Sequence, residues 1–580
     1  MEKLKTYWYS NQLNINVQIV GLAFFIFYAF LALIFYKERT LSFDSAAFSF
    51  QLIQTKTFFT PLHRWGSVFS QIIPLLAIKS GCSLDTFLKT YSLGFVLYYY
   101  IGFLIITLLF KNNRIAFIYL LTLCLTYRNT FYFSVSELSQ GLVLVIVLYA
   151  MLTELQNEHS KNKRILFFCS FVLISILYFF HQLLIIPITF VFIYLMIKNK
   201  KYKNLQIWVL FGFTICWFGF RLMMLPENSY ELVKIPDKQL FIKQIPNFFN
   251  LPSFKYLCQF FKTEILLVSI FFGVVQVLIL IKKKWLMFLL FFTYVFTYIV
   301  LITITYYRGE SPNMYEQYYI LFGFFIAFSL DSITQHILPP KIMIVILPLL
   351  IYGFYKIYDA HELPTKRLNY LTALVRQGQK IENKKYIIHA DDFPWGYAWN
   401  GWELSVETLL LSSIESNQNS VTFYVPEEGE KVELNLKRGN LHAPTWQKGI
   451  MNTNILDADY FYIPEKTNYM YLNQRTRNRA YYYERIKYDY IWMQAINRKA
   501  KERGVSIDEM IKIDAQYMAN KYEQEHPAIP FSEKEIIIQE IRTNKKWMNL
   551  LQTKAKERGI SIDEMISIDA EYIEKNENQD

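Results

Sequence analysis

The stretch FDSAAFSFQLIQTKTFFTPLHRWGSVFSQIIPLLAIKSG, residues 43–81, decides how the rest of the chain is interpreted. It directly follows the first long apolar run, with a lone carboxylate, Asp44, near its start and the pair His63-Arg64 at its middle. A further membrane span is one interpretation of this stretch. We instead predict two amphipathic helices, at about 45–54 and 63–79, which lie at the outer membrane surface.

The composition sets the class of protein. The chain has 580 residues, of which 53% are hydrophobic and 18% are aromatic. A water-soluble domain of this size does not need so many apolar side chains, so the sequence predicts a mainly α-helical, multi-pass membrane protein. The first apolar run has no cleavage site of small residues near its end and is therefore predicted to be an uncleaved span.

Apolar runs long enough to cross a membrane number about eleven. They lie near 17–36, 84–110, 114–134, 136–155, 165–180, 182–197, 205–224, 263–281, 285–306, 316–333 and 342–357. With a cytoplasmic N-terminus and 43–81 kept outside, the lysine-rich loops near 111–114, 161–164, 198–203 and 282–284 all become cytoplasmic. Counting 65–80 as a span would invert this charge bias. We therefore predict a plasma (inner) membrane protein whose C-terminal part is extracytoplasmic, or periplasmic.

The net charge of +12 comes largely from the same lysine-rich loops. Since the excess lysines lie in the predicted cytoplasmic loops, the sequence gives no support for nucleic-acid binding.

Beyond a membrane module at 1–360, the composition becomes that of a charged, water-soluble region. Residues 361–476 predict a small α/β domain, with strands near 385–390, 421–425 and 460–463 and a helix near 405–412. The tail, 477–580, contains a repeat: 491–517 recurs as 546–572. In each copy a glycine ends one helix and a Ser-x-x-Glu capping box starts the next, which predicts two helical hairpins for packing or docking.

Ionisable side chains inside or beside the spans recur on the predicted outer side, which suggests a cavity opening there. Taken one at a time, they have plainer interpretations. Asp44 fits a solvated interfacial carboxylate, Glu137 a favourable charge in the first helical turn, and His181 a residue at a tight turn. Arg308 could pair with nearby Glu310, although we favour it as an anion ligand. The candidate binding set is His63, Arg64, Arg128, Glu137, His181, Arg308, Glu316 and Tyr318.

This arrangement resembles the GT-C superfamily of membrane glycosyltransferases, which use polyprenyl-phosphate-linked sugars. The resemblance is carried by Asp44 in RTLSFDSAAF after the first span, by the two helices that follow it, and by Arg308 with Tyr315 and Tyr318 before a late span. It covers about 1–360 and implies a helix bundle that transfers a sugar on the outer side to a glycan, lipid or protein acceptor. Asp44 would be the catalytic base of an inverting reaction, with Arg308 and Arg64 or Arg128 near the phosphate and membrane lipids around the donor chain.

This sequence has Asp44-Ser45 where many members of the superfamily have a second acidic residue, so no cofactor is assigned and a divalent metal stays open. The pair Asp391-Asp392 fits either a divalent ion or, as we favour, a solvated turn. Three other functions stay open: an O-antigen polymerase or ligase, a transporter or flippase for a lipid-linked glycan, and a non-enzymatic membrane scaffold whose tail hairpins recruit partners.

Overall fold

The computed structural model describes residues 2–577, with gaps at 126, 161, 201, 226–237, 309–311, 335–338, 382, 391–392, 395–397, 399–400, 402, 427–439, 444–448, 466, 473–478, 526–540 and 542–544. Some residues inside helices and strands, among them 2–16 and 312–319, are described by their backbone alone. The chain divides into two compact units, Met1–Thr365 and Lys366–Asp580. Each unit is described by itself.

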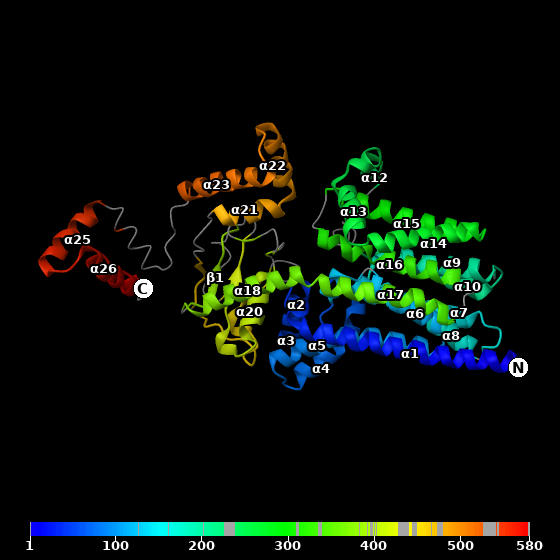
Figure 1. The fold of residues 1–580 in the computed structure, drawn as a ribbon. Helices are drawn as coiled ribbons and strands as arrows, with labels where there is room; N and C mark the ends of the chain where they lie inside the picture. The colour runs from blue at the N-terminus through cyan, green and yellow to red at the C-terminus, as the bar shows by residue number, and fades with distance from the viewer. Residues whose placement is uncertain are drawn as a thin grey trace. The chain divides into compact units, whose positions relative to one another are not determined.

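The first unit is built from helices (Figure 1). In chain order they are α1 (Glu2–Ile34), α2 (Tyr36–Thr40), α3 (Asp44–Thr55), α4 (Val68–Lys79), α5 (Leu84–Leu104), α6 (Asn113–Leu125), α7 (Glu137–Leu155), α8 (Lys163–Leu177), α9 (Ile185–Asn199), α10 (Leu205–Met224), α12 (Lys238–Gln244), α13 (Pro252–Thr263), α14 (Leu266–Ile281), α15 (Trp285–Thr305), α16 (Pro312–Thr334) and α17 (Pro339–Asp359). Helix α18 (Glu362–Gln379) leads into the second unit.

Six helices among the described residues are long and apolar enough to cross a membrane, and the pair α13 and α14 would make a seventh. These helices indicate a multi-pass membrane protein, and the small sheets are confined to the second unit. The number is lower than the eleven expected for two reasons. Two apolar runs form shorter helices, α6 with 13 residues and α8 with 15, and helices α16 and α17 are only partly described. Eleven crossings therefore remain a prediction.

Residues 43–81 form two short helices, as the sequence predicts. They are α3, which begins at Asp44, and α4, which begins at Val68, with two 3₁₀ turns at Pro61–His63 and Trp65–Ser67 between them. Helix α4 is apolar but too short for a candidate span, and α3 is not among the candidate spans. Helix α4 packs along α5.

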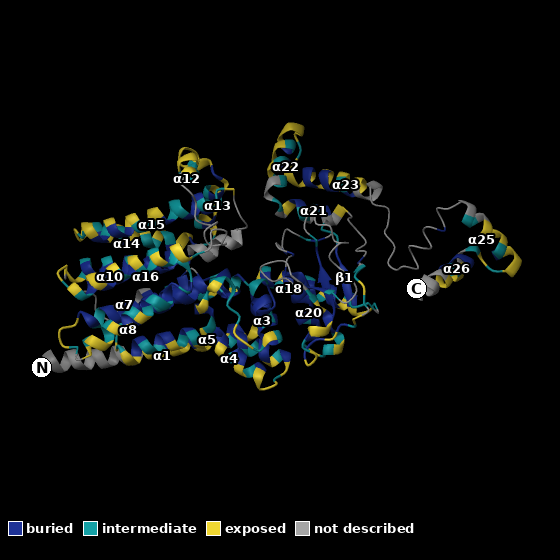
Figure 2. Cartoon of the chain, turned by 180° about the vertical axis from the view of Figure 1, so that it is seen from behind, coloured by how far each residue is buried: buried dark blue, intermediate teal, exposed yellow. Residues whose placement is uncertain are grey.

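Helix α7 lies at the centre of the first unit. In its apolar segment 83% of the residues are buried, whereas in α10, at the periphery, only 17% are (Figure 2). It packs against α5, α6, α8, α9 and α16. Polar side chains on α7 therefore face protein, where each must find a partner or serve a function.

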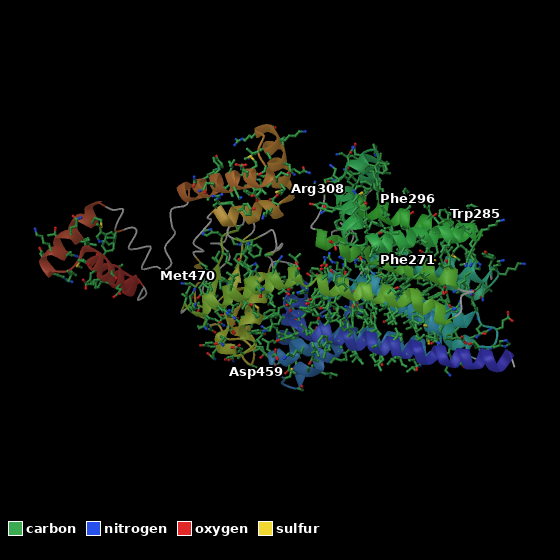
Figure 3. The ribbon with its side chains drawn as sticks, in the orientation of Figure 1. Phe271, Trp285, Phe296, Arg308, Asp459 and Met470 are labelled. Atoms are coloured by element: carbon green, nitrogen blue, oxygen red, sulfur yellow. The ribbon has the colours of Figure 1, made fainter. Side chains whose placement is uncertain are left out.

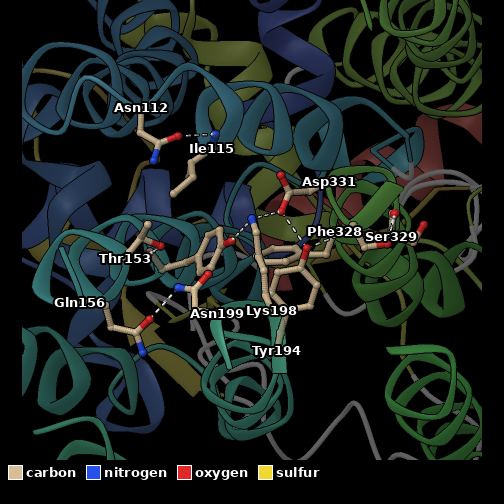
Figure 4. A network of polar contacts seen from close by, with 12 residues as sticks. Asn112, Ile115, Thr153, Gln156, Tyr194, Lys198, Asn199, Phe328, Ser329 and Asp331 are labelled. Carbon is tan, nitrogen blue, oxygen red and sulfur yellow. Dashed lines mark hydrogen bonds and ion pairs between the residues drawn. The ribbon is translucent and has the colours of Figure 1, made fainter. Parts of the chain in front are cut away.

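One end of α7 is held by a buried ionic network (Figure 4). The Lys198 ammonium on α9 lies 2.5 Å from a carboxylate oxygen of Asp331 on α16 and donates to the hydroxyl of Tyr149 on α7 at 3.0 Å. Tyr194 donates to the same Asp331 oxygen at 2.7 Å. Because each charge is matched, the network ties three helices together at the lysine-rich end of the bundle.

The second unit contains a three-stranded parallel sheet in the order β2-β1-β5. Its strands are β1 (Lys385–Ile387), β2 (Thr422–Tyr424) and β5 (Met470–Tyr471), and Tyr386 pairs with both Phe423 and Met470. Helix α20 (Leu404–Ser413) packs on β2, and a separate hairpin joins β3 (Asn440–Ala443) to β4 (Gly449–Asn452). Inside the unit, Arg367 and Glu407 form an ion pair at 2.6 Å, with side chains 2% and 0% exposed.

The tail forms the predicted hairpins. They are α22 (Tyr490–Arg503) with α23 (Ile507–Glu525), and α25 (Lys545–Arg558) with α26 (Ile562–Glu577). Gly504 and Gly559 have φ of 66° and 65°, and Ser506 and Ser561 cap the second helix of each copy. In both copies a tryptophan indole donates to an aspartate at 3.0 Å: Trp492 to Asp514, and Trp547 to Asp569.

The repeat extends further toward the N-terminus than the sequence match indicates. Helix α21 (Arg479–Tyr488) packs on α23 and buries Ile486 in the core of the first copy. Ile541, at the equivalent position, is buried in the core of the second.

Candidate functional site

Asp44 lies at the first position of α3, and its neighbours fix the start of that helix. Phe43 has φ of 51°, a backbone conformation that is strained for a bulky side chain. The Ser134 hydroxyl donates to the Arg39 carbonyl at 2.9 Å and lies 3.4 Å from the Ser45 hydroxyl. The start of α3 is thereby attached to the loop that leads into α7.

Arg64 is presented by a tight, hydrogen-bonded loop. Leu62 and His63, just before it, have φ of 57° and 56°. The fully buried Gln71 holds the loop through both backbone groups of Phe59, accepting from its N–H at 2.9 Å and donating to its carbonyl at 2.7 Å.

The same loop is joined to the turn that carries His181. The Gly66 N–H donates to the Phe179 carbonyl at 3.0 Å. A Cβ on Gly66 would lie 2.3 Å from the ring of Phe180, so only glycine lets the two segments approach this closely.

These connections bring Asp44, Arg64, Glu137 and His181 together, four of the predicted site residues. Arg64 forms a 3.1 Å ion pair with Glu137, with side chains 13% and 10% exposed. Asp44 is half-buried and within electrostatic range of both. Burial raises the pKa of Asp44 to about 7, and the negative charge of Glu137 adds to this, while Arg64 opposes it.

His181 is held neutral in this site. Burial lowers the pKa of His181 well below its ordinary value, and the positive charges of Arg64 and Arg221 lower it further. Its Nδ1 accepts a hydrogen bond from the Leu183 N–H at 3.2 Å. Since Nδ1 accepts, the proton of the neutral ring is on Nε2, which is then a hydrogen-bond donor.

Sequence reasoning missed several polar residues around this site. Arg221 lies in the last turn of α10, and its guanidinium is 5.1 Å from the ring centroid of Phe179. Its positive charge also interacts electrostatically with His181. The Tyr91 hydroxyl on α5, within electrostatic range of Glu137, and the Gln140 amide on α7 are buried polar groups. Gln140 could have been found from its spacing, since it lies three residues after Glu137 on one helical face.

Arg39 was also missed, although it precedes Asp44 by only five residues. Its side chain is 2% exposed, and its guanidinium donates to the Ser92 hydroxyl at 2.8 Å and to the Phe131 carbonyl. Burial lowers the pKa of Arg39 to about 10, so it stays charged at neutral pH. Its side-chain bonds attach α2 to α5 and to the loop before α7.

The structure does not show Arg128 with the Asp44 group. Arg128 forms ion pairs with Glu264 and Asp359, and Lys356 lies 3.5 Å from each of the same two carboxylates. Two positive and two negative charges balance, so this network is suited to holding three segments together.

The remaining predicted residues lie outside the group in different ways. Arg308 is exposed and donates to the Tyr307 hydroxyl at 2.8 Å (Figure 3). His63 is exposed. Glu310 and the Asp391-Asp392 pair lie outside the described residues, and the side chains of Glu316, Tyr315 and Tyr318 are not described. The proposed roles of these residues stay predictions.

The described part of the chain contains no group of three or more His, Cys, Asp or Glu side chains placed to hold a metal ion.

Known proteins do not extend this description. No protein-family model matches the chain, and no curated protein and no solved structure is significantly similar to it. The function must therefore be argued from the group itself. That group combines a carboxyl that titrates near neutral pH, a guanidinium held by a second carboxylate, and a neutral imidazole, all at one end of a helix bundle. Such a group can exchange a proton at physiological pH and interact with an anion.

Proposed function

We propose that this protein is a membrane glycosyltransferase. It would move a sugar from a polyprenyl-phosphate-linked donor to a glycan, lipid or protein acceptor on the outer side of the membrane. The observation that carries the proposal is Asp44, whose pKa is about 7 within a group that includes Arg64 and Glu137. A general base works best when its pKa lies near the working pH, and an aspartate with an ordinary pKa would accept a proton poorly.

In the proposed reaction the acceptor oxygen attacks C1 of the sugar from the face opposite the phosphate. The new C1–O bond forms while the bond from C1 to the phosphate oxygen breaks, and the leaving polyprenyl phosphate takes the electron pair. Asp44 takes the acceptor proton. The configuration at C1 is inverted, and no other reactant is needed.

The charges of the group fit this sequence of events. With Asp44 ionised, the side chains of Asp44, Glu137, Arg64 and Arg221 sum to zero, since His181 is neutral. Once Asp44 is protonated, they sum to one positive charge, just as the leaving phosphate gains negative charge. A positive charge fixed in a site of low polarity stabilises such a transition state.

The proposal also includes a membrane topology. It places α3 and α4 on the outer membrane surface, the start of α7 just beneath them, and eleven crossings of GT-C type in 1–360. Arg308 remains a predicted anion ligand there. The proposal is supported by α3, whose bounds match the first helix expected after the first span, and by α4, which ends where the second was expected but begins at Val68 instead of residue 63.

The test is sugar transfer by purified protein from a panel of radiolabelled polyprenyl-phosphate sugars, with and without EDTA. Asp44→Asn should lower kcat by at least about 100-fold. Asp85→Asn is the matched control: Asp85 also lies in the first turn of a helix, but pairs with Lys89 at 2.6 Å, and this variant should stay active.

Full activity in a folded Asp44→Asn variant would remove Asp44 as the base. No transfer by the wild type from any donor, with uptake of lipid-linked glycan into vesicles instead, would favour the transporter. Loss of transfer in the presence of EDTA would show that a divalent metal takes part in the reaction.

A further inference from the structure

Residues 239–263 form a basic and aromatic surface, which we call the interfacial segment. It comprises most of α12, the 3₁₀ helix Ile245–Asn250, and α13. Lys243, Lys255 and Lys262 are exposed, and the segment contains no aspartate or glutamate. It also leaves large apolar side chains in contact with solvent: Ile242 is 62% exposed, Ile245 55% and Phe249 73%.

The direction of α13 is set by a sharp bend. The axes of α13 and α14 differ by 88°, with the break at residues 264–265. Helix α14 is an apolar segment with a row of exposed side chains, among them Leu267, Ile270 and Val274. If α14 follows the membrane normal, α13 runs along the membrane surface.

Helix α13 has two opposite faces. Ser253, Leu257 and Phe260 are buried, and the Ser253 hydroxyl donates to the Thr303 carbonyl of α15 at 2.7 Å. Lys255 and Lys262 are about half a turn away from this row, so they point away from the protein.

Aromatic side chains of the interfacial segment form one cluster, in which Phe249 is exposed and Phe248 and Phe254 are half-buried. The rings of Phe248 and Phe249 lie 5.1 and 5.2 Å from the ring of Phe254. Arg308, at the C-terminal end of α15, adds a further exposed cation at the same end of the bundle (Figure 3). Aromatic rings flanked by lysines, next to a lipid-facing helix, are typical of side chains in the head-group layer of a bilayer.

We propose that the interfacial segment binds the anionic head groups of phospholipids at the end of the bundle opposite residues 282–284. The apolar side chains enter the boundary of the acyl chains, while the lysines meet the phosphates. Three observations favour a membrane over a protein partner: the positive charge without any carboxylate, the right-angle bend, and the direct continuation into α14. The proposal does not depend on sugar transfer.

The experiment measures backbone amide hydrogen exchange of the interfacial segment in the full-length protein, reconstituted in nanodiscs. One set of discs is pure phosphatidylcholine, and the other contains about 30% phosphatidylglycerol, an anionic lipid. Each lysine near an anionic surface strengthens binding to that surface by about fivefold. Three lysines can therefore slow exchange in the anionic discs by at most about 100-fold. We expect exchange to be at least about tenfold slower in the anionic discs, and the difference to shrink at high salt.

The decisive variant changes Lys243, Lys255 and Lys262 to glutamine, which should abolish the difference between the two lipids. All three lysines are exposed, so the variant should fold. The matched control removes the same charge from three exposed lysines of the tail, Lys501, Lys512 and Lys556, and should keep the difference.

A second variant, Ile245→Ser with Phe249→Ser, should speed exchange in both lipids. Equal exchange of the wild type in the two lipids would overturn the proposal. So would a lipid effect that survives the triple lysine variant, or protection that appears only when another protein is added.

Discussion

Replacing Asp44 by asparagine is expected to stabilise the protein at alkaline pH, although it should abolish the proposed activity. In the folded state the pKa of Asp44 is about 7, and the ordinary value is 3.8. Folding therefore makes ionisation of this carboxyl unfavourable, because the group leaves water and lies near Glu137. A functional group that is costly to bury typically lowers stability.

The sign of the pH dependence follows from proton binding. Between pH 3.8 and about 7 the folded state holds the Asp44 proton and the unfolded state does not, so stability falls as pH rises through this window. Above pH 7 both states are ionised and the full penalty applies. The difference between the two pKa values corresponds to about 4 kcal/mol.

Asp44→Asn removes this ionisation. The variant should therefore gain up to about 4 kcal/mol over the wild type at pH 8, and the gain should shrink toward zero near pH 4. For the first unit this corresponds to a rise in Tm on the order of 5 °C at pH 8.

The assay is thermal unfolding of both proteins in the same detergent at a fixed scan rate, at several pH values between 4.5 and 8.5. Asp85→Asn is again the matched control. Because Asp85 accepts hydrogen bonds from Lys89 and Tyr36 at 2.6 and 2.5 Å, its replacement should lower Tm. A lower Tm for Asp44→Asn at pH 8, or a difference independent of pH, would refute the reasoning about Asp44.

Three further substitutions probe other parts of the chain. Glu407→Gln should destabilise the second unit by about 3–5 kcal/mol, seen by denaturant unfolding, because Arg367 is left buried without its carboxylate; an unchanged midpoint would contradict this. Gly66→Ala should cost about 1–3 kcal/mol of stability, since the new methyl group meets the buried ring of Phe180, and limited proteolysis near residue 66 should speed up if this is right. Trp492→Phe should cost about 1 kcal/mol by removing an indole hydrogen bond, measured by hydrogen exchange of the first hairpin; exchange at the wild-type rate would mean that the bond adds no stability.

Local sequence signals predicted the helices after the first span well. The expected 45–54 and 63–79 correspond to α3 at Asp44–Thr55 and to the 3₁₀ turn plus α4 that end at Lys79. Helix ends depend on nearby residues, so they can be inferred from sequence alone. The same holds for the tail hairpins, where Gly504 and Gly559 end a helix in the left-handed conformation.

The site could be predicted only in part. Asp44, Arg64, Glu137 and His181 were expected on one side of the membrane, and the structure places them in one group. Arg128 was expected to belong to the same site. It lies instead with Glu264 and Asp359, which are more than 130 residues away in sequence, so no local pattern could reveal the pairing.

The sequence by itself determined that this is a helical protein with apolar segments long enough to cross a membrane, a small α/β region and a repeated tail. Hydrophobic periodicity, helix caps and glycine positions act over a few residues, so they can be recognised in the sequence. Only the tertiary structure decided which charges are neighbours, which helix is at the centre, and that Asp44 titrates near pH 7. Electrostatic energy depends on distance and on the loss of water, and both are set when segments remote in sequence pack together.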